Sequence, residues 1–203
     1  MESSFPATSM PDRDWWAALW PDPAATLRQI GIATGMAVLD LCCGDGYFTS
    51  ALAKLTGGRV QALDLDPAML EQAKAEAERQ GVSVTRWIRT DARDLAGCID
   101  VPVDCVLIAN TFHGVPDQAG LARAVRTVLR PGGIFAIINW HRLDRETTTV
   151  LGKPRGPATA MRMTPDAVGA VVEPEGFTKT AIVELPPYHY GIVFRTPALS
   201  REP

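Results

Sequence analysis

The chain has 203 residues, of which 46% are hydrophobic and 21% charged, with a formal net charge of −3 and a pI of about 5.6. This length and composition are typical of one globular domain with a substantial core, and they leave little room for a second domain. Because no long basic run is present, a large phosphate-binding surface is disfavoured and nucleic acid is not an expected partner.

The N-terminal segment does not resemble a secretory signal. Residues 1–10 have neither a positively charged start nor an apolar core of signal-peptide length. No stretch reaches the roughly 18 apolar residues of a membrane-spanning helix. We therefore expect a cytoplasmic protein without a membrane partner. We expect one domain over residues 1–203, with a core at about 14–196 and flexible tails at 1–13 and 197–203.

Strand and helix patterns alternate through most of the chain, which predicts a parallel sheet covered by helices on both faces. In chain order, we expect helices at 14–20 and 23–31, a strand at 36–43, a glycine turn at 44–46, a helix at 47–55, a strand at 60–65, a helix at 67–81, strands around 82–88 and at 103–109, a helix around 121–129 and a strand at 134–138. After an unpatterned segment at 141–163, we expect a short helix at 165–174 and strands at 179–185 and 188–195.

Local signals support several of these boundaries. Asp22, Asp66 and Thr164 each precede a proline, which predicts an N-cap followed by proline at the first helical position. The short Pro186-Pro187 link predicts an antiparallel hairpin. The lost pattern at 141–163 predicts a long functional loop or an irregular insertion.

The first half of the chain carries a nucleotide-binding arrangement of strand, glycine turn, helix, strand and acid. Gly44 and Gly46 would let the backbone approach a ligand closely. Asp64, about 20 residues later at the end of the second strand, can accept hydrogen bonds from ribose hydroxyls. Since nicotinamide dehydrogenases share glycine turns of this kind, the spacing alone does not identify the ligand.

Further motifs distinguish a nicotinamide dehydrogenase from other nucleotide-binding enzymes. They are VLDLCCGDGYFT at 38–49, ALDLDPAML at 62–70, TDARDL at 90–95, VDCVLIANTFHGVPD at 103–117 and VLRPGGIFAI at 128–137. In content and order they resemble the class I S-adenosylmethionine-dependent methyltransferases. The Cys-Cys-Gly turn is similar to that of the type 11-like branch, which acts on small molecules and quinone precursors. The resemblance covers about residues 14–196. It implies a Rossmann-like, doubly wound α/β fold with a seven-stranded, mostly parallel sheet and a C-terminal antiparallel hairpin.

The resemblance also implies a set of residues that bind S-adenosylmethionine: Asp40, Cys42, Gly44, Gly46, Asp64, Leu65, Asp91, Ala92 and Asn110. The first four would surround the methionine moiety, and the last would end the fourth strand beside the cofactor. Asp64 would hold the ribose while Leu65 packs on the adenine. Asp91 would accept from the adenine amino group, and Ala92 would offer its backbone N–H.

Two positions in the glycine turn carry expectations of their own. Cys42 stands where many family members have their first glycine. Because cysteine has a Cβ atom, we expect the backbone at Cys42 to keep a negative φ. Asp45 is expected to be an exposed turn residue.

The four cysteines do not suggest a metal site. Cys42, Cys43, Cys98 and Cys105 form no CxxC pair and no cluster with histidine. Their neighbours are apolar, so we expect buried, reduced thiols and no bound metal.

Methyl transfer from a sulfonium mainly needs an aligned nucleophile and the exclusion of water, and it needs a base only where the acceptor must lose a proton. His113 and His141 follow the fourth and fifth strands and are the candidate catalytic bases, with a structural role left open for each. His189, on the hairpin, is expected at the surface or in packing.

Other residues could shape an acceptor pocket at the same end of the sheet. Lys153 and Arg155 could bind an anionic acceptor, with Arg162 adding to a positive rim, or they could form an exposed polar loop. Trp140 is either a pocket wall or a core residue. The tryptophans at 15, 16 and 20 could form a lid or pack on the sheet edge.

The sequence therefore favours a methyltransferase that moves a methyl group in line from S-adenosylmethionine to an unidentified small molecule, leaving S-adenosylhomocysteine. Base-directed amino methyltransferases often carry Asn/Asp-Pro-Pro-Tyr/Phe after the fourth strand, whereas this chain has Asn-Thr-Phe-His at 110–113. A non-catalytic cofactor-binding module acting through a partner is the main alternative, and a nicotinamide-dependent oxidoreductase is the third. A homodimer is left open.

Overall fold

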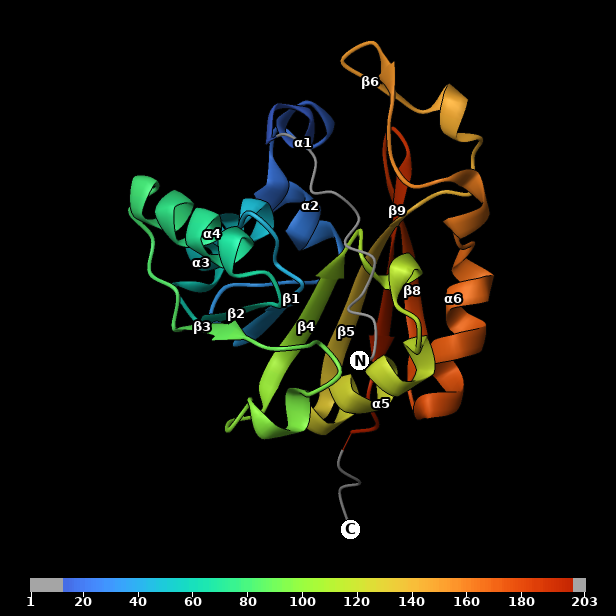
Figure 1. Ribbon diagram of the computed structural model, residues 1–203. Helices are drawn as coiled ribbons and strands as arrows, with labels where there is room; N and C mark the ends of the chain where they lie inside the picture. Colours follow the sequence, from blue (N-terminus) through green and yellow to red (C-terminus); the bar gives the residue numbers. More distant parts are fainter. Residues whose placement is uncertain (1–12, 199–203) are drawn as a thin grey trace, which may run out of the picture.

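A seven-stranded mixed sheet organises the computed structural model, which describes residues 13–198 (Figure 1). Its strand order is β3-β2-β1-β4-β5-β9-β8. Neighbours from β3 to β5 run parallel, whereas β9 pairs antiparallel with both β5 and β8. The predicted fold class is confirmed, including the antiparallel hairpin at the C-terminal end of the sequence.

The strands of the large sheet are β1 (Val38–Leu41), β2 (Val60–Asp64), β3 (Arg86–Arg89), β4 (Val103–Ala109), β5 (Leu129–Trp140), β8 (Thr178–Leu185) and β9 (His189–Arg195). The α-helices are α1 (Arg13–Leu19), α2 (Pro23–Gln29), α3 (Tyr47–Thr56), α4 (Pro67–Arg79), α5 (Gln118–Val128) and α6 (Pro165–Val172). A small ribbon is made by β6 (Thr149–Val150) and β7 (Lys153–Pro154).

Three helices begin where the cap-plus-proline signals place them. The Asp22 carboxylate accepts from Ala25 N at 3.0 Å, and the Asp66 carboxylate accepts from Ala68 N at 2.8 Å. The Thr164 hydroxyl accepts from Ala167 N at 3.2 Å. Each cap satisfies a backbone N–H that has no partner within the helix, so these helix starts are encoded locally.

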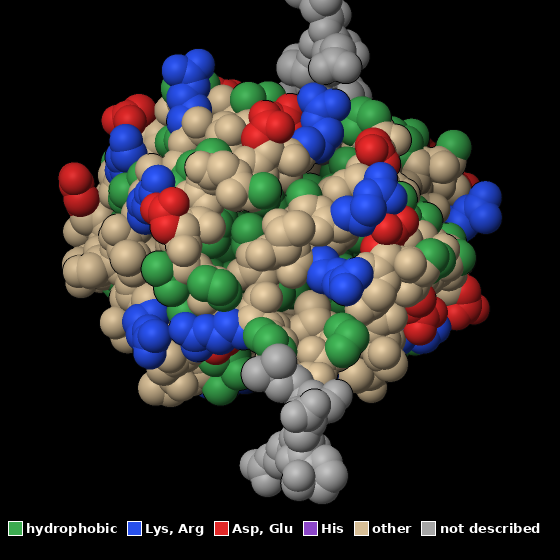
Figure 2. Space-filling view, turned by 90° about the horizontal axis from the view of Figure 1, so that it is seen from below, with side chains coloured by type: hydrophobic (Ala, Val, Ile, Leu, Met, Phe, Trp, Pro, Cys, Tyr) green, Lys and Arg blue, Asp and Glu red, His purple; other side chains and the backbone are tan. Residues whose placement is uncertain are grey.

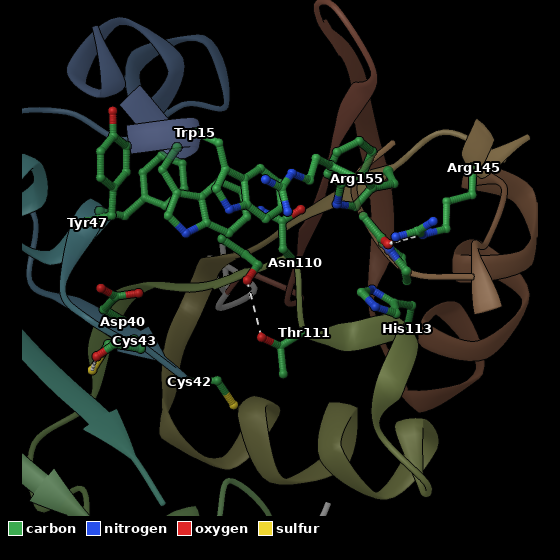
Figure 3. A pocket seen from close by; sticks show the side chains of 17 residues that line it. Trp15, Asp40, Cys42, Cys43, Tyr47, Asn110, Thr111, His113, Arg145 and Arg155 are labelled. Atoms are coloured by element: carbon green, nitrogen blue, oxygen red, sulfur yellow. Dashed lines mark hydrogen bonds between the residues drawn. The ribbon is translucent and has the colours of Figure 1, made fainter. Parts of the chain in front are cut away.

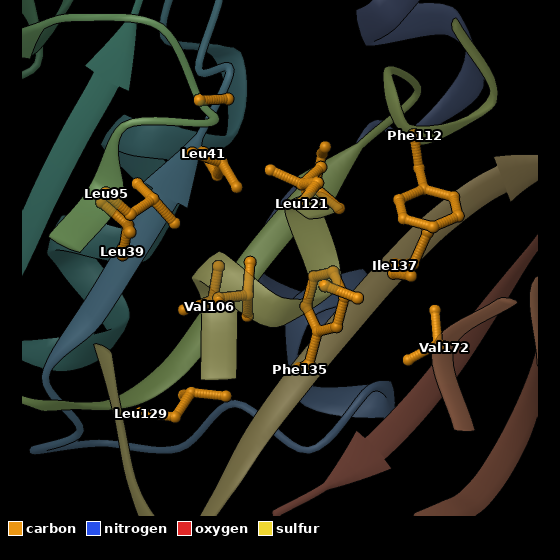
Figure 4. Close-up of a cluster of buried hydrophobic side chains, with 14 of the residues drawn as sticks. Leu39, Leu41, Leu95, Val106, Phe112, Leu121, Leu129, Phe135, Ile137 and Val172 are labelled. Carbon is orange, nitrogen blue, oxygen red and sulfur yellow. The ribbon is translucent and has the colours of Figure 1, made fainter. Parts of the chain in front are cut away.

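Alternate residues of each central strand enter the two layers of core on opposite faces of the sheet. In β4, Cys105 and Leu107 face α2 and α3, whereas Val106 and Ile108 face α5 and α6. The second layer is shown in Figure 4, where Leu121 and Val172 from the helices meet Phe135 from the sheet. Both faces are therefore covered, as the continuous apolar strands predict.

Several boundaries differ from the sequence prediction. β3 begins at Arg86, and Val82 and Val84 pack against the core before it without strand pairing. β5 begins at Leu129, which pairs with Val103 across an irregularity in register. The predicted tails lie outside the described residues, except that Arg13 already belongs to α1 and that 197 and 198 are described.

The end of the molecule opposite α1 shows no single-sign surface. Figure 2 views this end, and Lys and Arg side chains are interspersed there with Asp and Glu. Among the helices of residues 13–198, none has the length and apolar content that crossing a bilayer requires.

Candidate functional site

The site lies where the strand order reverses. After β1 the chain continues to β2 on one side, and after β3 it crosses to β4 on the other side of β1. The loops that leave β1 and β4 therefore diverge and open a crevice at the carboxyl ends of the strands, where open α/β sheets bind ligands.

Two residues at this crevice have left-handed backbone. Cys42 follows β1 with φ 59°, and Asn110 follows β4 with φ 58°. The expectation of a negative φ at Cys42 was wrong, because neighbouring hydrogen bonds hold the turn: Cys43 N donates to Leu63 O at 3.0 Å. In a non-glycine residue such a conformation costs on the order of 1–3 kcal/mol, and strained conformations of this kind concentrate at functional sites.

A cavity of about 470 Å³ opens at this crevice. It is lined by residues of α1, the loops after β1 and β4, and the segment after β5: Trp15, Trp16, Asp40, Cys42, Cys43, Gly44, Tyr47, Phe48, Ala109, Asn110, Thr111, His113, Trp140, Arg145, Arg155, Gly156 and Pro157. In Figure 3, Asp40 and the two cysteines lie on one side, with His113, Arg145 and Arg155 on the other. Of the residues predicted to bind the cofactor, Asp40, Cys42, Gly44 and Asn110 line this cavity.

Asp40 is an unusual carboxyl group. It is 2% exposed, and Thr49 Oγ1 donates a hydrogen bond to its Oδ2 at 2.6 Å. Burial raises the pKa of Asp40 to about 7, and the nearby carboxylates Asp64 and Asp45 act in the same direction. A cationic ligand in the cavity would therefore stabilise the ionised form of Asp40.

Asp64 holds the glycine turn. Its Oδ2 accepts from Gly44 N at 2.8 Å, and its Oδ1 accepts from Asp66 N at 3.0 Å. Gly46 has a structural role, because a Cβ atom there would lie 2.8 Å from the backbone of Ala73 in α4. Neither Asp64 nor Gly46 lines the cavity, so both support the residues that do.

The remaining predicted cofactor residues lie beyond β2 and β3 and also lie outside the cavity lining. Leu65 is 40% exposed, and Ala92 is buried. The side chain of Arg93 donates two hydrogen bonds to Asp91, at 2.9 and 2.7 Å, and its backbone N–H donates a third, which together lower the pKa of Asp91. These residues therefore lie beside the cavity, beyond the ends of β2 and β3.

The two candidate bases lie in different places. His113 lines the cavity, and its Nδ1 lies 3.4 Å from Asn139 Oδ1. Burial lowers the pKa of His113, and its Nε2 is buried without a hydrogen-bond partner. By contrast, His141 lies outside the lining, with its Nε2 2.9 Å from Glu184 Oε2 on the edge strand β8. His113 is therefore the one of the two that can meet a ligand in this cavity.

Part of the chain matches a known protein family. Residues 38–133 match the family model described as a methyltransferase domain. Residues 38–133 are therefore similar to the domain of the S-adenosylmethionine-dependent methyltransferases.

Curated proteins that are similar to this chain act on different acceptors. The demethylmenaquinone methyltransferase of Lactiplantibacillus plantarum is 36% identical over 122 residues, which are 59% of this chain and 52% of the relative. The tRNA 5-carboxymethoxyuridine methyltransferase of Escherichia coli K12 is 32% identical over 126 residues, which are 62% of this chain and 48% of the relative. The chain thus spans about half the length of these curated relatives.

A solved structure supports the fold along nearly the whole chain. The SAM-dependent methyltransferase from Aquifex aeolicus superposes with a TM-score of 0.75 at 24% identity, covering 91% of this chain and 93% of the other. The class I architecture is therefore shared beyond the 38–133 segment.

Three expectations about charged residues and histidine need correction or refinement. Asp45 is buried in this protein, because Arg13 reaches it at 3.7 Å across 32 residues of sequence. Arg162 is also buried and does not contribute to a positive rim. His189 is completely buried between the rings of Trp20 and Trp140, so it is a packing residue.

The roles of several residues that line the cavity were left open, or the residues were missed, in the sequence analysis. Trp15, Trp16 and Trp140 are both buried and part of the cavity wall, so packing and pocket roles coincide. Arg145 was missed, since no sequence pattern surrounds it. Arg155 lines the cavity, whereas Lys153 is exposed outside it.

Of the four cysteines, Cys43 and Cys105 are buried as predicted, whereas Cys42 and Cys98 are half-buried. All four cysteines are free, and burial raises the pKa values of Cys42, Cys43 and Cys105. Within residues 13–198, no group of three or more His, Cys, Asp or Glu is placed to hold a metal ion.

Proposed function

We propose that this protein binds S-adenosylmethionine in the cavity between β1 and β4 and transfers its methyl group to a small-molecule acceptor. The observation that carries the proposal is the pair of left-handed residues, Cys42 and Asn110, that flank the switch point of a class I methyltransferase sheet. Both residues line the crevice that such sheets use for their ligands, and strained backbone of this kind concentrates at functional sites.

The lining residues fit this cofactor. Asn110 Oδ1 and Trp16 Nε1 are both buried without a hydrogen-bond partner, and both residues line the cavity. Buried polar atoms are normally paired, so these two are expected to meet a polar ligand. Asp40 offers a carboxyl group to a ligand that carries positive charge. Asp64 and Asp91 remain the proposed partners of the ribose and of the adenine amino group.

When bound, S-adenosylmethionine supplies an activated methyl group on a sulfonium sulfur that is its own leaving group. The protein's part is to orient the acceptor and to keep water out. The indole rings of Trp15, Trp16 and Trp140 provide an apolar wall for both purposes. No metal is needed for this chemistry.

His113 is the proposed proton acceptor where the methyl acceptor is an O–H or N–H group. Asn139 Oδ1 accepts from His113 Nδ1, which leaves Nε2 with its lone pair free. Because burial lowers the pKa of His113, the ring is neutral at pH 7 and can take the proton that the acceptor loses.

A small acceptor is favoured by the elements that surround the cavity and by the net charge of the chain. α1 and the segment after β5 lie at the same end of the sheet as the cavity (Figure 1). Polynucleotides require a broad basic surface, and the chain carries a net charge of −3.

Calorimetric titration with S-adenosylmethionine and, separately, with NADH tests the class of ligand. We expect S-adenosylmethionine to bind and NADH not to bind. Binding of NADH alone would instead support an oxidoreductase. Cofactor binding without methyl transfer to any small molecule of a cell extract would support the alternative of a non-catalytic module.

A further inference from the structure

We propose that the acceptor is a planar anion, an aromatic carboxylate or phosphate, and that Arg155 binds its charge. The inference rests on the proposed function and specifies the substrate class of the same cavity. It is carried by the charges and the unpartnered polar atoms on the side of the cavity away from Asp40.

Charge is divided across the cavity. Asp40 is the one carboxyl group among the lining residues, and it belongs to the side formed by β1. Arg145 and Arg155 are the cations of the lining, and both come from the segment after β5. The side of the cavity formed by the segment after β5, where we place the methyl acceptor, therefore carries positive charge, and no carboxylate of the lining balances it there.

The guanidinium of Arg155 is available to a ligand. In the part of the chain that the structure describes, no ion pair or side-chain hydrogen bond involves it, and its Nε is buried without a partner. It lies 5.7 Å from the ring centre of Trp15. Arg155 is half-buried, and leaving its buried Nε without an acceptor is unfavourable; an anion that accepts hydrogen bonds from the guanidinium removes that penalty.

The backbone of Arg155 is held by hydrogen bonds, although its side chain makes none in the part of the chain that the structure describes. Arg155 N donates to Thr148 O at 2.8 Å, and Arg155 O accepts from Arg162 Nη2 at 3.0 Å. The guanidinium of Arg162 itself lies 5.0 Å from the ring centre of Trp140. Arg155 is thus presented to the cavity by a fixed piece of chain, as a preorganised binding group would be.

Arg145 has a different role. Its guanidinium donates to Gly156 O at 3.1 Å and to Pro154 O at 3.4 Å, and it lies 3.3 Å from the exposed Glu146. These contacts occupy much of its hydrogen-bonding capacity and hold the backbone next to Arg155. Arg145 is therefore a positioning residue, which adds positive charge at longer range.

The walls beside Arg155 suit a flat ligand. Trp15 and Trp16 are stacked with ring centres 4.7 Å apart, and Trp15 and Trp140 lie 6.2 Å apart at an angle of 47°. Indole faces bind planar, conjugated rings well, because large apolar areas meet at little cost in side-chain entropy. An aromatic ring that carries an anionic group matches both the tryptophans and Arg155.

The test uses the full chain saturated with S-adenosylhomocysteine and titrated with benzoate, salicylate, phenyl phosphate and the neutral benzamide. We expect at least one of these anions to bind about tenfold or more tightly than benzamide, since a charge-assisted pair is involved. The comparison of benzoate with phenyl phosphate shows whether a carboxylate or a phosphate is preferred.

Substitutions test whether Arg155 provides the positive charge that binds the anion. Arg155→Gln should remove the preference for the anion, and Arg155→Lys should restore part of it. The exposed Arg142, in the same segment but outside the lining, provides the control Arg142→Gln, which should keep the preference.

Two results would overturn the assignment while leaving the proposed function intact. One is that S-adenosylhomocysteine binds but no anion is preferred over benzamide. The other is that Arg155→Gln weakens S-adenosylhomocysteine itself about tenfold or more, which would place Arg155 on the cofactor. If S-adenosylhomocysteine does not bind the unmodified protein, the proposed function itself is contradicted, and the acceptor proposal that rests on it is contradicted too.

Discussion

Asp64 connects the end of β2 to the glycine turn through its hydrogen bonds to Gly44 N and Asp66 N. We expect Asp64→Ala to weaken S-adenosylmethionine binding by on the order of 1–3 kcal/mol, because a charged partner of the ribose and the brace of the turn are lost together. Calorimetry measures the change. Asp66→Asn, which keeps a helix-capping side chain, is the matched control and should bind nearly as tightly as the unmodified protein. Unchanged affinity in folded Asp64→Ala would refute the ribose assignment.

Asp40 makes the stability of the protein depend on pH. Its pKa is about 7 in the folded state and 3.8 as a free group, so the folded state keeps a proton that the unfolded chain has lost between these values. The free energy of unfolding should therefore fall as pH rises from about 4 to about 7, by at most about 4 kcal/mol from this group.

Asp40→Asn removes that titration. Urea denaturation at about pH 5 and about pH 8 should show a smaller loss of stability on raising the pH in Asp40→Asn than in the unmodified protein. Parallel losses in the two proteins would show that Asp40 is ionised at both pH values in the folded state.

His113 and His141 form a natural pair of variants, because one lines the cavity and the other does not. We expect His113→Ala to lower methyl transfer from labelled S-adenosylmethionine to the small-molecule fraction of a cell extract by about a hundredfold. Cofactor affinity should persist. His141→Ala should retain most of the transfer. Near-normal transfer in both variants would leave orientation of the acceptor as the main catalytic effect.

At the scale of elements, the segment from β5 to α6 is organised by Arg162. Its guanidinium donates to Pro157 O, Leu143 O, Arg155 O and Thr148 Oγ1 at 2.9–3.1 Å. Removing it would leave buried acceptors without a donor, at a cost on the order of 3 kcal/mol. Arg162→Leu should therefore speed amide hydrogen exchange in residues 143–157, whereas exposed Arg142→Leu should not. Equal protection in both variants would show that the ribbon β6–β7 holds this segment by itself.

The order of the elements was predictable, because their signals are local. Alternating apolar runs fix the strands, and the caps at Asp22, Asp66 and Thr164 fix helix starts within a few residues. The cavity residues Asp40, Cys42, Gly44, Asn110 and His113 were also predictable, because parallel strands bring their carboxyl ends to one edge.

What could not be predicted depends on contacts between distant parts of the chain. From the sequence, Asp45 is predicted to be an exposed turn residue, but Arg13 of α1 contacts it and it is buried. From the sequence, Arg162 is predicted to be a surface cation, but in the structure backbone carbonyls of the preceding segment surround its guanidinium. The left-handed backbone of Cys42 similarly follows from the strands that hold the turn, against the local preference of cysteine.

For the whole molecule, the packing of α2 on the sheet limits the size of one strand residue. A Cβ atom on Gly191 in β9 would lie 2.5 Å from Cγ2 of the buried Ile30. Gly191→Ala should destabilise the protein by about 1–3 kcal/mol through overpacking. Gly97→Ala, where a Cβ atom would meet nothing within 4 Å, is the control and should be close to neutral. Chemical denaturation measures both, and equal midpoints would mean that α2 shifts without cost.

The central proposal is that the cofactor binds between β1 and β4, at the switch point of the sheet, and a crystal structure of the protein with S-adenosylhomocysteine tests it most directly. We expect density for the amino-acid part of the ligand between Cys42 and Asn110, with the ribose near Asp64. Density at another surface, with this cavity filled only by water, would contradict the account.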